Sequence, residues 1–273
     1  MSLIPKPFGE LVEEAIWQDV EYGSYDADLA IWADLASRAG GPVLEIGAGS
    51  GRVSLHLARQ GVPVTAVEAD DRLAGELADR ARAEELPLSA LAADATAPGL
   101  ADALAADRRG RASVPPGGFR AAFAPLQVIQ LFGAGERRRA LDSLSEVLAP
   151  GGVFAAALVD ESTISTAGGP LPPPSPPDMR EVDGWVFSSE PLWVQASDEM
   201  LRMRRLRQRV SPRGDLSRSV HDDLLHRLPP ERLEREAVQA GMAPSGRRDV
   251  AAGESEAGSV VVILAKATSV GHP

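Results

Sequence analysis

The sequence predicts an α/β protein in which a mostly parallel sheet carries helices on both faces. Short apolar runs alternate with amphipathic stretches of helical length between residues 43 and 160. This alternation is typical of β-α-β units, whose strands are parallel and buried on both sides. The length of 273 residues and the hydrophobic fraction of 44% are sufficient for a sizeable core.

Two helices are expected before the first strand, within residues 8–39. This stretch contains helix-forming residues and the aromatic residues Trp17, Tyr22, Tyr25 and Trp32. Gly23-Ser24 interrupts it, so the second helix is expected from about Asp26. Gly40-Gly41 is a suitable end, because glycine commonly terminates helices.

The most informative segment is residues 43–54, Val-Leu-Glu-Ile-Gly-Ala-Gly-Ser-Gly-Arg-Val-Ser. An apolar run is followed by Gly47, Gly49 and Gly51, and then by an amphipathic helix over residues 52–60. Glycine permits positive φ and the close approach of a ligand. The helix start is expected to add unpaired N–H groups and a positive dipole end. The segment therefore predicts a site for a polar or anionic ligand at the carboxyl end of a parallel strand.

The next two strands also end in acidic residues. Residues 62–67 form an apolar run that ends at Glu68-Ala69-Asp70-Asp71, and residues 88–93 end at Asp94-Ala95. A carboxylate at position 68 has two acceptor oxygens for two ribose hydroxyls. Asp94 is placed either to accept a bond from an adenine amino group or to cap the following helix. Asp70 or Asp71 is expected to cap a helix over residues 72–85.

The remaining elements are expected in the order strand, helix, strand, an inserted antiparallel meander, helix and a final hairpin. Residues 107–118 are a polar loop, and the proline-rich residues 166–178 are an extended connector. The expected strands are 119–124, 153–159, 184–195, 200–210, 217–227, 247–250 and 259–267, and the expected helices are 136–148 and 230–240.

Four motifs in this order carry a family resemblance. They are Val-Leu-Glu-Ile-Gly-Ala-Gly-Ser-Gly, Val-Glu-Ala-Asp, Ala-Asp-Ala and Leu-Ala-Pro-Gly-Gly-Val-Phe. With them the chain resembles class I S-adenosylmethionine-dependent methyltransferases of the small-molecule branch. The resemblance covers residues 41–160 and resumes near the C-terminus. It implies a Rossmann-like seven-stranded sheet with an N-terminal helical cap (1–40), a cofactor-binding core (41–160 and 229–273) and an inserted substrate-binding or lid region (161–228).

The resemblance implies a set of residues that contact S-adenosyl-L-methionine. They are Tyr25, Glu45, Gly47, Ala48, Gly49, Gly51, Arg52, Glu68, Ala69, Asp94, Ala95, Leu126 and Gln130. Glu45 is expected under the methionine amino group, directly or through water, and Tyr25 either over the cofactor or as a packing residue. Gln127 and Gln130 are expected to orient the acceptor or the cofactor carboxylate, or else to bond backbone.

The acceptor side is less defined. His221 and His226 are candidate catalytic residues, but they lie five positions apart and face opposite sides of a strand, so at most one reaches the acceptor. A neutral amine needs no protein base, whereas a hydroxyl needs a base or a metal, and no metal-ligand cluster is apparent. Seven arginines between residues 202 and 218 are expected to grip an anionic substrate, or to be solvated or paired with acids elsewhere.

Composition limits the remaining alternatives. The absence of cysteine excludes disulfides and thiolate chemistry, and the net charge of −11 disfavours nucleic acid as a partner. No apolar run is as long as a membrane span, which needs about eighteen residues, and no signal pattern opens the chain, so a cytoplasmic location is expected.

The expected partner is a small-molecule acceptor, and a homodimer is allowed. Two alternative functions stay open: a regulatory protein that binds the cofactor without catalysis, and a nicotinamide-dependent oxidoreductase.

Overall fold

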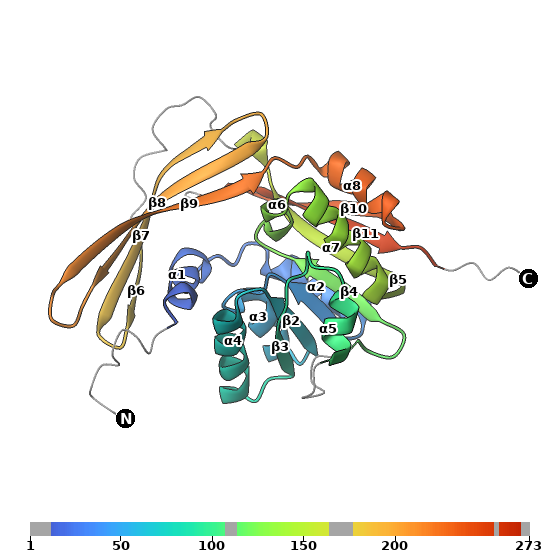
Figure 1. Ribbon diagram of the computed structural model, residues 1–273, viewed down its shortest axis with the longest axis horizontal. Coiled ribbons are helices and arrows are strands. Elements are labelled where there is room, and N and C mark those ends of the chain that lie inside the picture. Colours follow the sequence, from blue (N-terminus) through green and yellow to red (C-terminus); the bar gives the residue numbers. More distant parts are fainter. Residues whose placement is uncertain (1–11, 107–113, 164–176, 254–256, 269–273) are drawn as a thin grey trace, which may run out of the picture.

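The main sheet has seven strands in the order β10–β11–β5–β4–β1–β2–β3 (Figure 1). The computed structural model describes residues 12–106, 114–163, 177–253 and 257–268. The strands are β1 (Val43–Ile46), β2 (Val64–Glu68), β3 (Leu88–Ala92), β4 (Phe119–Ala124), β5 (Leu148–Val159), β10 (Met242–Val250) and β11 (Ser259–Lys266). The pairs among β1 to β5 are parallel, and β11 is antiparallel to both β5 and β10. The predicted mostly parallel sheet with a C-terminal hairpin is confirmed.

Helices cover both faces of this sheet. They are α2 (Leu29–Ala39), α3 (Arg52–Arg59), α4 (Asp71–Ala83), α5 (Leu100–Ala106), α6 (Val128–Leu131), α7 (Ala134–Val147) and α8 (Pro230–Gln239). Successive strand residues point to opposite faces. Leu44 therefore packs with residues of α5, α7 and α8, whereas Val43 packs with residues of α2 and α3. Two apolar layers enclose the sheet, and its parallel strands end at a common edge.

A second, separate sheet of four strands lies at the other end of the molecule (Figure 1). Its strands are β6 (Asp178–Val182), β7 (Trp185–Ala196), β8 (Met200–Val210) and β9 (Leu216–His226), and each neighbouring pair is antiparallel. The meander was expected to have three strands, so β6 is an addition to it. Asp183 and Gly184 have φ of 49° and 80° and form the two-residue hairpin turn for which Asp-Gly is a known signal. Of the expected connector, residues 166–176 lie outside the described residues, and its last residue, Asp178, begins β6.

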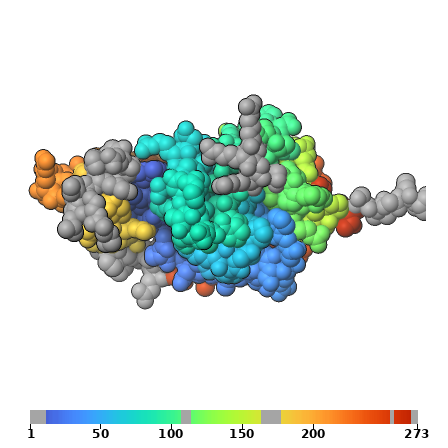
Figure 2. Space-filling model, turned by 90° about the horizontal axis from the view of Figure 1, so that it is seen from below, coloured from blue at the N-terminus to red at the C-terminus, as the bar shows by residue number. Residues whose placement is uncertain are grey.

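Helix α1 (Glu13–Tyr22) lies between the two sheets (Figure 1). One of its faces packs Trp17 edge-on against Phe187 of β7, with ring centroids 5.1 Å apart. On another side Asp19 pairs with Arg80 of α4 at 2.9 Å, and Figure 2 shows the blue atoms of α1 at the border between the yellow second sheet and α4. Trp32 of α2 instead packs in the main core. The two N-terminal helices therefore have different neighbours.

Other elements also differ from the expectation. Helix α6 was not predicted, the helix expected directly after Asp94 begins only at Leu100 as α5, and β10 begins at Met242 instead of residue 247. Strand β5 begins at Leu148, because the Pro-Gly-Gly segment forms a bulge inside the strand instead of a loop before it. Phe119 pairs with Leu148 but Ala121 pairs with Val153, so the register shifts across the bulge.

Candidate functional site

The glycine-rich loop connects the carboxyl end of β1 to the start of α3. Gly47, Gly49 and Gly51 have φ of 63°, 55° and 97°, a region that disfavours side chains. A Cβ on Gly47 would lie 2.6 Å from Cγ1 of Val128, and one on Gly49 would lie 2.1 Å from Oε1 of Gln18. Glycine is therefore required both by the backbone conformation and by the close packing of α1 and α6 against the loop.

The backbone N–H groups of this loop are already bonded to the protein. Gly49 N donates to Oε2 of Glu68 at 2.8 Å, and Ser50 N donates to Oε1 of Gln18 at 2.7 Å. Ala48 N and Gly51 N donate to backbone carbonyls. These four groups belong to the loop itself. The donors expected at the helix start are the N–H groups in the first turn of α3, which begins at Arg52, and that expectation remains a prediction. Gly47 is exposed at this edge.

Glu68 ends β2 beside the loop. Besides the bond from Gly49, its Oε1 accepts a bond from Asp70 N at 3.0 Å, and each oxygen retains acceptor capacity. Ala69 next to it is exposed. Of the two expected caps, Asp70 is the one used: its Oδ1 accepts bonds from the N–H groups of Arg72 and Leu73. Glu68 is thus held in place at the edge where a ligand on the loop would lie.

Asp94 follows β3 at the same edge and is exposed. Its Oδ1 accepts bonds of 2.7 Å from both N and Oγ1 of Thr96. Because α5 begins only at Leu100, Asp94 forms a local turn and does not cap that helix. Ala95 is buried beneath the turn. The predicted adenine contact of Asp94 remains a prediction.

Glu45 is buried in β1, directly behind the loop. It is 2% exposed, and Oγ of Ser54 in α3 donates a hydrogen bond to it. Burial raises the pKa of the Glu45 carboxyl to about 8, against the opposing effects of the Ser54 bond and the Arg52 charge. The side chain is thus neutral in a large share of molecules near pH 7. Its predicted position under the cofactor amino group remains a prediction.

Arg52 is engaged by the chain itself. Its guanidinium donates to both oxygens of Asp28, at 2.7 and 2.8 Å, and to the carbonyl of Tyr25 at 2.8 Å. The same group lies 5.0 Å from the centre of the Tyr25 ring. Arg52 therefore holds the segment between α1 and α2, including Tyr25, against the start of α3. A direct ligand contact of Arg52 or Tyr25 remains a prediction.

The loop after β4 is strained and tied to both sheets. Leu126 and Gln127 have φ of 47° and 60°, and such backbone conformations cluster at functional sites. Gln130 is fully buried: its Nε2 donates to the carbonyl of His226 at 3.1 Å, and its Oε1 accepts a bond from Val159 N at 2.8 Å. Of the alternatives expected for Gln130, the structure shows the bonding of backbone.

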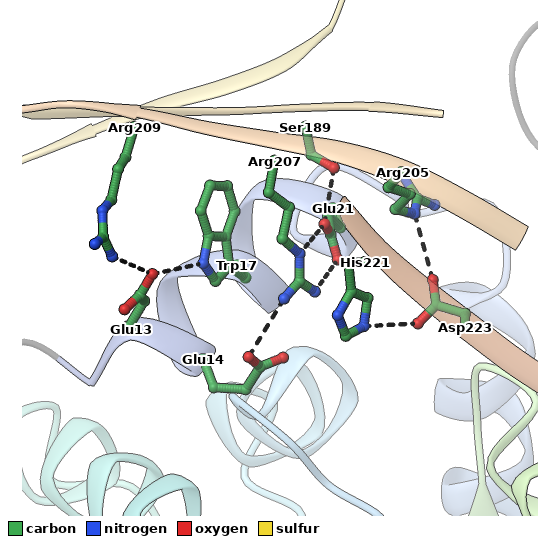
Figure 3. A network of polar contacts seen from close by, with 10 residues as sticks. All are labelled: Glu13, Glu14, Trp17, Glu21, Ser189, Arg205, Arg207, Arg209, His221 and Asp223. Atoms are coloured by element: carbon green, nitrogen blue, oxygen red, sulfur yellow. Dashed lines mark hydrogen bonds and ion pairs between the residues drawn. The ribbon is translucent and has the colours of Figure 1, made fainter. Parts of the chain in front are cut away.

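The two candidate histidines point to opposite sides of β9. The His221 ring lies on the side of α1, with Nε2 3.3 Å from Oδ1 of Asp223 (Figure 3). His226 lines a separate hollow of about 270 Å³ near the starts of α7 and α8. The sheet therefore separates the histidines, as their odd spacing predicts.

The arginines of the second sheet are largely paired with acids. Arg207 binds both oxygens of Glu21 at 2.8 Å, and Arg209 pairs with Glu13 at 2.6 Å (Figure 3). On the other face Arg204 pairs with Asp222 at 2.6 Å. Burial acts to raise the pKa of the Glu21 carboxyl, but the bonds and charge of Arg207 outweigh it and hold that pKa below its ordinary value. For these arginines the expected pairing with acids elsewhere is confirmed.

Sequence reasoning did not identify Gln18 or Asp223 as residues of the site. Gln18 reaches the loop from a helix 32 residues earlier in the chain, and no local pattern marks it. Asp223 stands two positions after His221, which on a strand places both on one face, so this signal was present. Within the described ranges no cluster of His, Asp or Glu is suited to a metal ion. Among the helices that the structure describes, none has the length and apolarity to cross a membrane.

Comparisons with known proteins agree with the fold. Residues 43–152 match the family model described as a methyltransferase domain, and no curated protein matches the chain. CalS10, an amino pentose methyltransferase from Micromonospora echinaspora, has 18% identity over 94% of this chain and 97% of its own, with a TM-score of 0.65. The sugar N-methyltransferase KedS8 from Streptoalloteichus has 15% identity over 98% and 97%, with a TM-score of 0.66. DesVI from Streptomyces venezuelae has 20% identity over 92% and 98%, with a TM-score of 0.64. At these identities the structures show a shared fold.

Proposed function

The chain carries a methyltransferase domain in the class I fold, and from this premise we propose that it transfers a methyl group from S-adenosylmethionine to a small molecule. The main observation behind the proposal is the position of the Glu68 carboxylate next to the backbone of Gly49. The hydrogen bond between them fixes a carboxylate at the tip of β2 beside a glycine-rich turn. This is the arrangement that positions a ribose next to a parallel strand.

The residues present fit a nucleoside with a sulfonium side chain. Gly47 is exposed, so its backbone is accessible to a ligand. Glu68 and Asp94 would accept bonds from the ribose and the adenine, and Leu126 would line the methionine end. The bound cofactor supplies a methyl group that its sulfonium already activates. The protein then has to position the acceptor about 3–3.5 Å from that methyl group.

We propose an amine on a small molecule as the acceptor, with an oxygen acceptor as the alternative. Two of the structural neighbours are named for methylation of an amino pentose and of a sugar nitrogen, which favours nitrogen. The second sheet and α1 would cover the acceptor and exclude water. The alternative function to be excluded by experiment is that of a regulatory protein that binds the cofactor without catalysis.

We assign the proton-accepting role to His221 in preference to His226. The His221 ring points to the side of α1, between the second sheet and the core (Figure 3). His226 instead lines its own hollow with Arg137 and Arg232. His221 would take the proton that the acceptor loses, a step that an oxygen acceptor requires and a protonated amine needs before attack.

Titration calorimetry with S-adenosylmethionine tests the cofactor site. We expect binding by the wild-type protein and no comparable binding of NADH. Glu68→Gln is expected to weaken binding about tenfold or more, because bonds to a charged acceptor are worth about 1.5–3 kcal/mol each. Asp71→Asn, an equal charge change on an exposed neighbour, is the matched control. Equal affinity of the two variants would refute the assignment of Glu68.

Turnover separates an enzyme from a regulatory protein. Purified protein is mixed with S-adenosylmethionine and a panel of small amines, amino sugars and phenols, and S-adenosylhomocysteine release is measured. Release with an amine supports the proposal, and release with phenols alone supports oxygen transfer. Tight cofactor binding without release from the whole panel contradicts catalysis on these acceptor classes and favours the regulatory alternative.

A further inference from the structure

Three side chains form a connected group on the face of the second sheet that is directed at α1. Nε2 of His221 lies 3.3 Å from Oδ1 of Asp223, and Nε of Arg205 lies 3.5 Å from Oδ2 of the same carboxylate. Arg205 is directly opposite His221 in the β8–β9 register. The two oxygens of Asp223 are therefore divided between an imidazole and a guanidinium (Figure 3).

The three members of this group differ in exposure. The side chain of His221 is 39% exposed, whereas those of Asp223 and Arg205 are 22% and 10% exposed. Oδ2 of Asp223 and Nε of Arg205 are buried and have no hydrogen-bond partner among the described residues. The ring of Tyr22 lies on the other side of Arg205, 5.7 Å from its guanidinium carbon. The imidazole is thus accessible, and the residues behind it are held in place.

We propose that Asp223 is a positioning residue that keeps the His221 proton on Nε2 and leaves the lone pair on Nδ1 for the acceptor. The inference rests on the proposed function, in which His221 takes the acceptor proton. The carboxylate has no proton to donate, so the nitrogen that faces it must carry one. The ion pair with Arg205 attracts the carboxylate from the other side through the permanent charge of the guanidinium.

The proton balance of the transfer follows from this arrangement. The acceptor proton moves to Nδ1 of His221, and the resulting imidazolium is stabilised by the Asp223 carboxylate. The acceptor lone pair forms the new bond to the methyl carbon as the carbon–sulfur bond breaks, and that electron pair remains on sulfur as a neutral thioether. No other reactant is needed.

Other charged and titratable groups surround the pair, and they come from three elements. They are Asp222 on β9, Arg205 and Arg207 on β8, and Glu21 and Tyr22 on α1. Asp222 is the useful comparison, because it interacts electrostatically with His221 but is bonded to Arg204 on the opposite face. It has the same charge as Asp223 without the contact to Nε2.

The experiment is long-range ¹H–¹⁵N NMR of the full chain labelled at histidine. The chain has four histidines, and His221→Asn assigns the signal of interest. In the wild-type protein the neutral His221 ring is expected to carry its proton on Nε2. In Asp223→Asn the amide oxygen is expected to face Arg205, which places the amide NH₂ group against Nε2. The ring is then expected to switch to the Nδ1–H tautomer.

The control Asp222→Asn is expected to leave the Nε2–H tautomer unchanged, and Asp223→Glu to retain it. Persistence of the Nε2–H form in Asp223→Asn, or the same switch in both Asn variants, would overturn the inference. If Asp223→Asn does not fold, loss of the Nε2–H form in Asp223→Glu would overturn it as well. The tautomer is read without substrate, so failure of the proposed function appears separately, as absent cofactor binding or turnover.

Discussion

Oε1 of Gln18 accepts a hydrogen bond of 2.7 Å from the backbone N–H of Ser50, and this bond attaches α1 to the glycine-rich loop. Arg80 reinforces the attachment, since its Nη1 donates to the Ser50 carbonyl at 3.3 Å and to Asp19 at 3.0 Å. The same helix contacts the second sheet through Glu21. The glycine-rich loop and the second sheet are therefore joined by one short helix.

Gly49→Ala is expected to destabilise the protein and to weaken cofactor binding. The new Cβ would lie 2.1 Å from Oε1 of Gln18, at a φ of 55°. The backbone conformation alone costs about 1–2 kcal/mol, and displacement of Gln18 adds to it. The measurement is urea unfolding of a double-mutant cycle with Gln18→Ala. Gly49→Ala should cost less in the Gln18→Ala background, and equal costs in both backgrounds would contradict the contact.

Arg207→Met is expected to cost about 3–5 kcal/mol of the free energy of unfolding, because it leaves the Glu21 carboxylate buried without its hydrogen-bonded countercharge. The Glu21 side chain is 0% exposed, and Ser189 would be its remaining hydrogen-bond donor among the described residues. Adding Glu21→Gln should recover much of the loss. Arg209→Met, which breaks a pair with 30% and 37% exposure, should cost less than about 1 kcal/mol. Similar losses in urea unfolding for the two arginine variants would contradict this ranking.

The local structure of the glycine-rich loop and the end of β2 was predictable because its signals are local. The glycines that require positive φ, the acid at the tip of β2 and the cap at Asp70 all lie within a few residues of the strand ends that position them. Strand β6 was missed for a different reason. Met179 is exposed and charged residues surround it in the sequence, so β6 is formed by its pairing with β7 around Asp183-Gly184.

The contacts that attach the second sheet to α1 and α6 join residues that are far apart in sequence. Glu21 and Arg207 are separated by 186 positions, and Gln130 and His226 by 96. The polar groups of these residues could equally well form hydrogen bonds with water, so the sequence alone does not identify their partners. The expected pairing of arginines with acids was correct as a class, but the structure was needed to show that α1 supplies the acids for Arg207 and Arg209, and that β9 supplies those for Arg204 and Arg205.

Gln130→Leu is expected to leave cofactor affinity nearly unchanged while it lowers turnover. The substitution removes the partners of the His226 carbonyl and the Val159 amide, and each buried group without a partner costs about 1–3 kcal/mol. Faster hydrogen exchange at Val159 together with unchanged calorimetric affinity would identify Gln130 as a bridge between β5 and β9. A large loss of affinity with unchanged exchange would instead support the predicted cofactor contact.

Glu45→Gln is expected to be more stable than the wild-type protein above neutral pH, with a difference that disappears toward pH 5. The pKa of Glu45 is about 8 in the folded protein and close to its ordinary value of 4.5 when unfolded. The folded state therefore binds the proton more tightly, and its stability falls as the pH rises from about 4.5 to about 8. The glutamine has no proton to lose, so it avoids this decline, which amounts to a few kcal/mol, at about 1.4 kcal/mol for each pKa unit.

The control is Glu84→Gln. Glu84 is an exposed acid, and its hydrogen bond from Arg59 lowers the pKa of its carboxyl. The stability of this variant should differ from that of the wild type by an amount that is constant between pH 6 and 9. Urea unfolding across this range measures both differences, and a pH-independent difference for Glu45→Gln would show that the buried carboxyl does not titrate as the geometry requires.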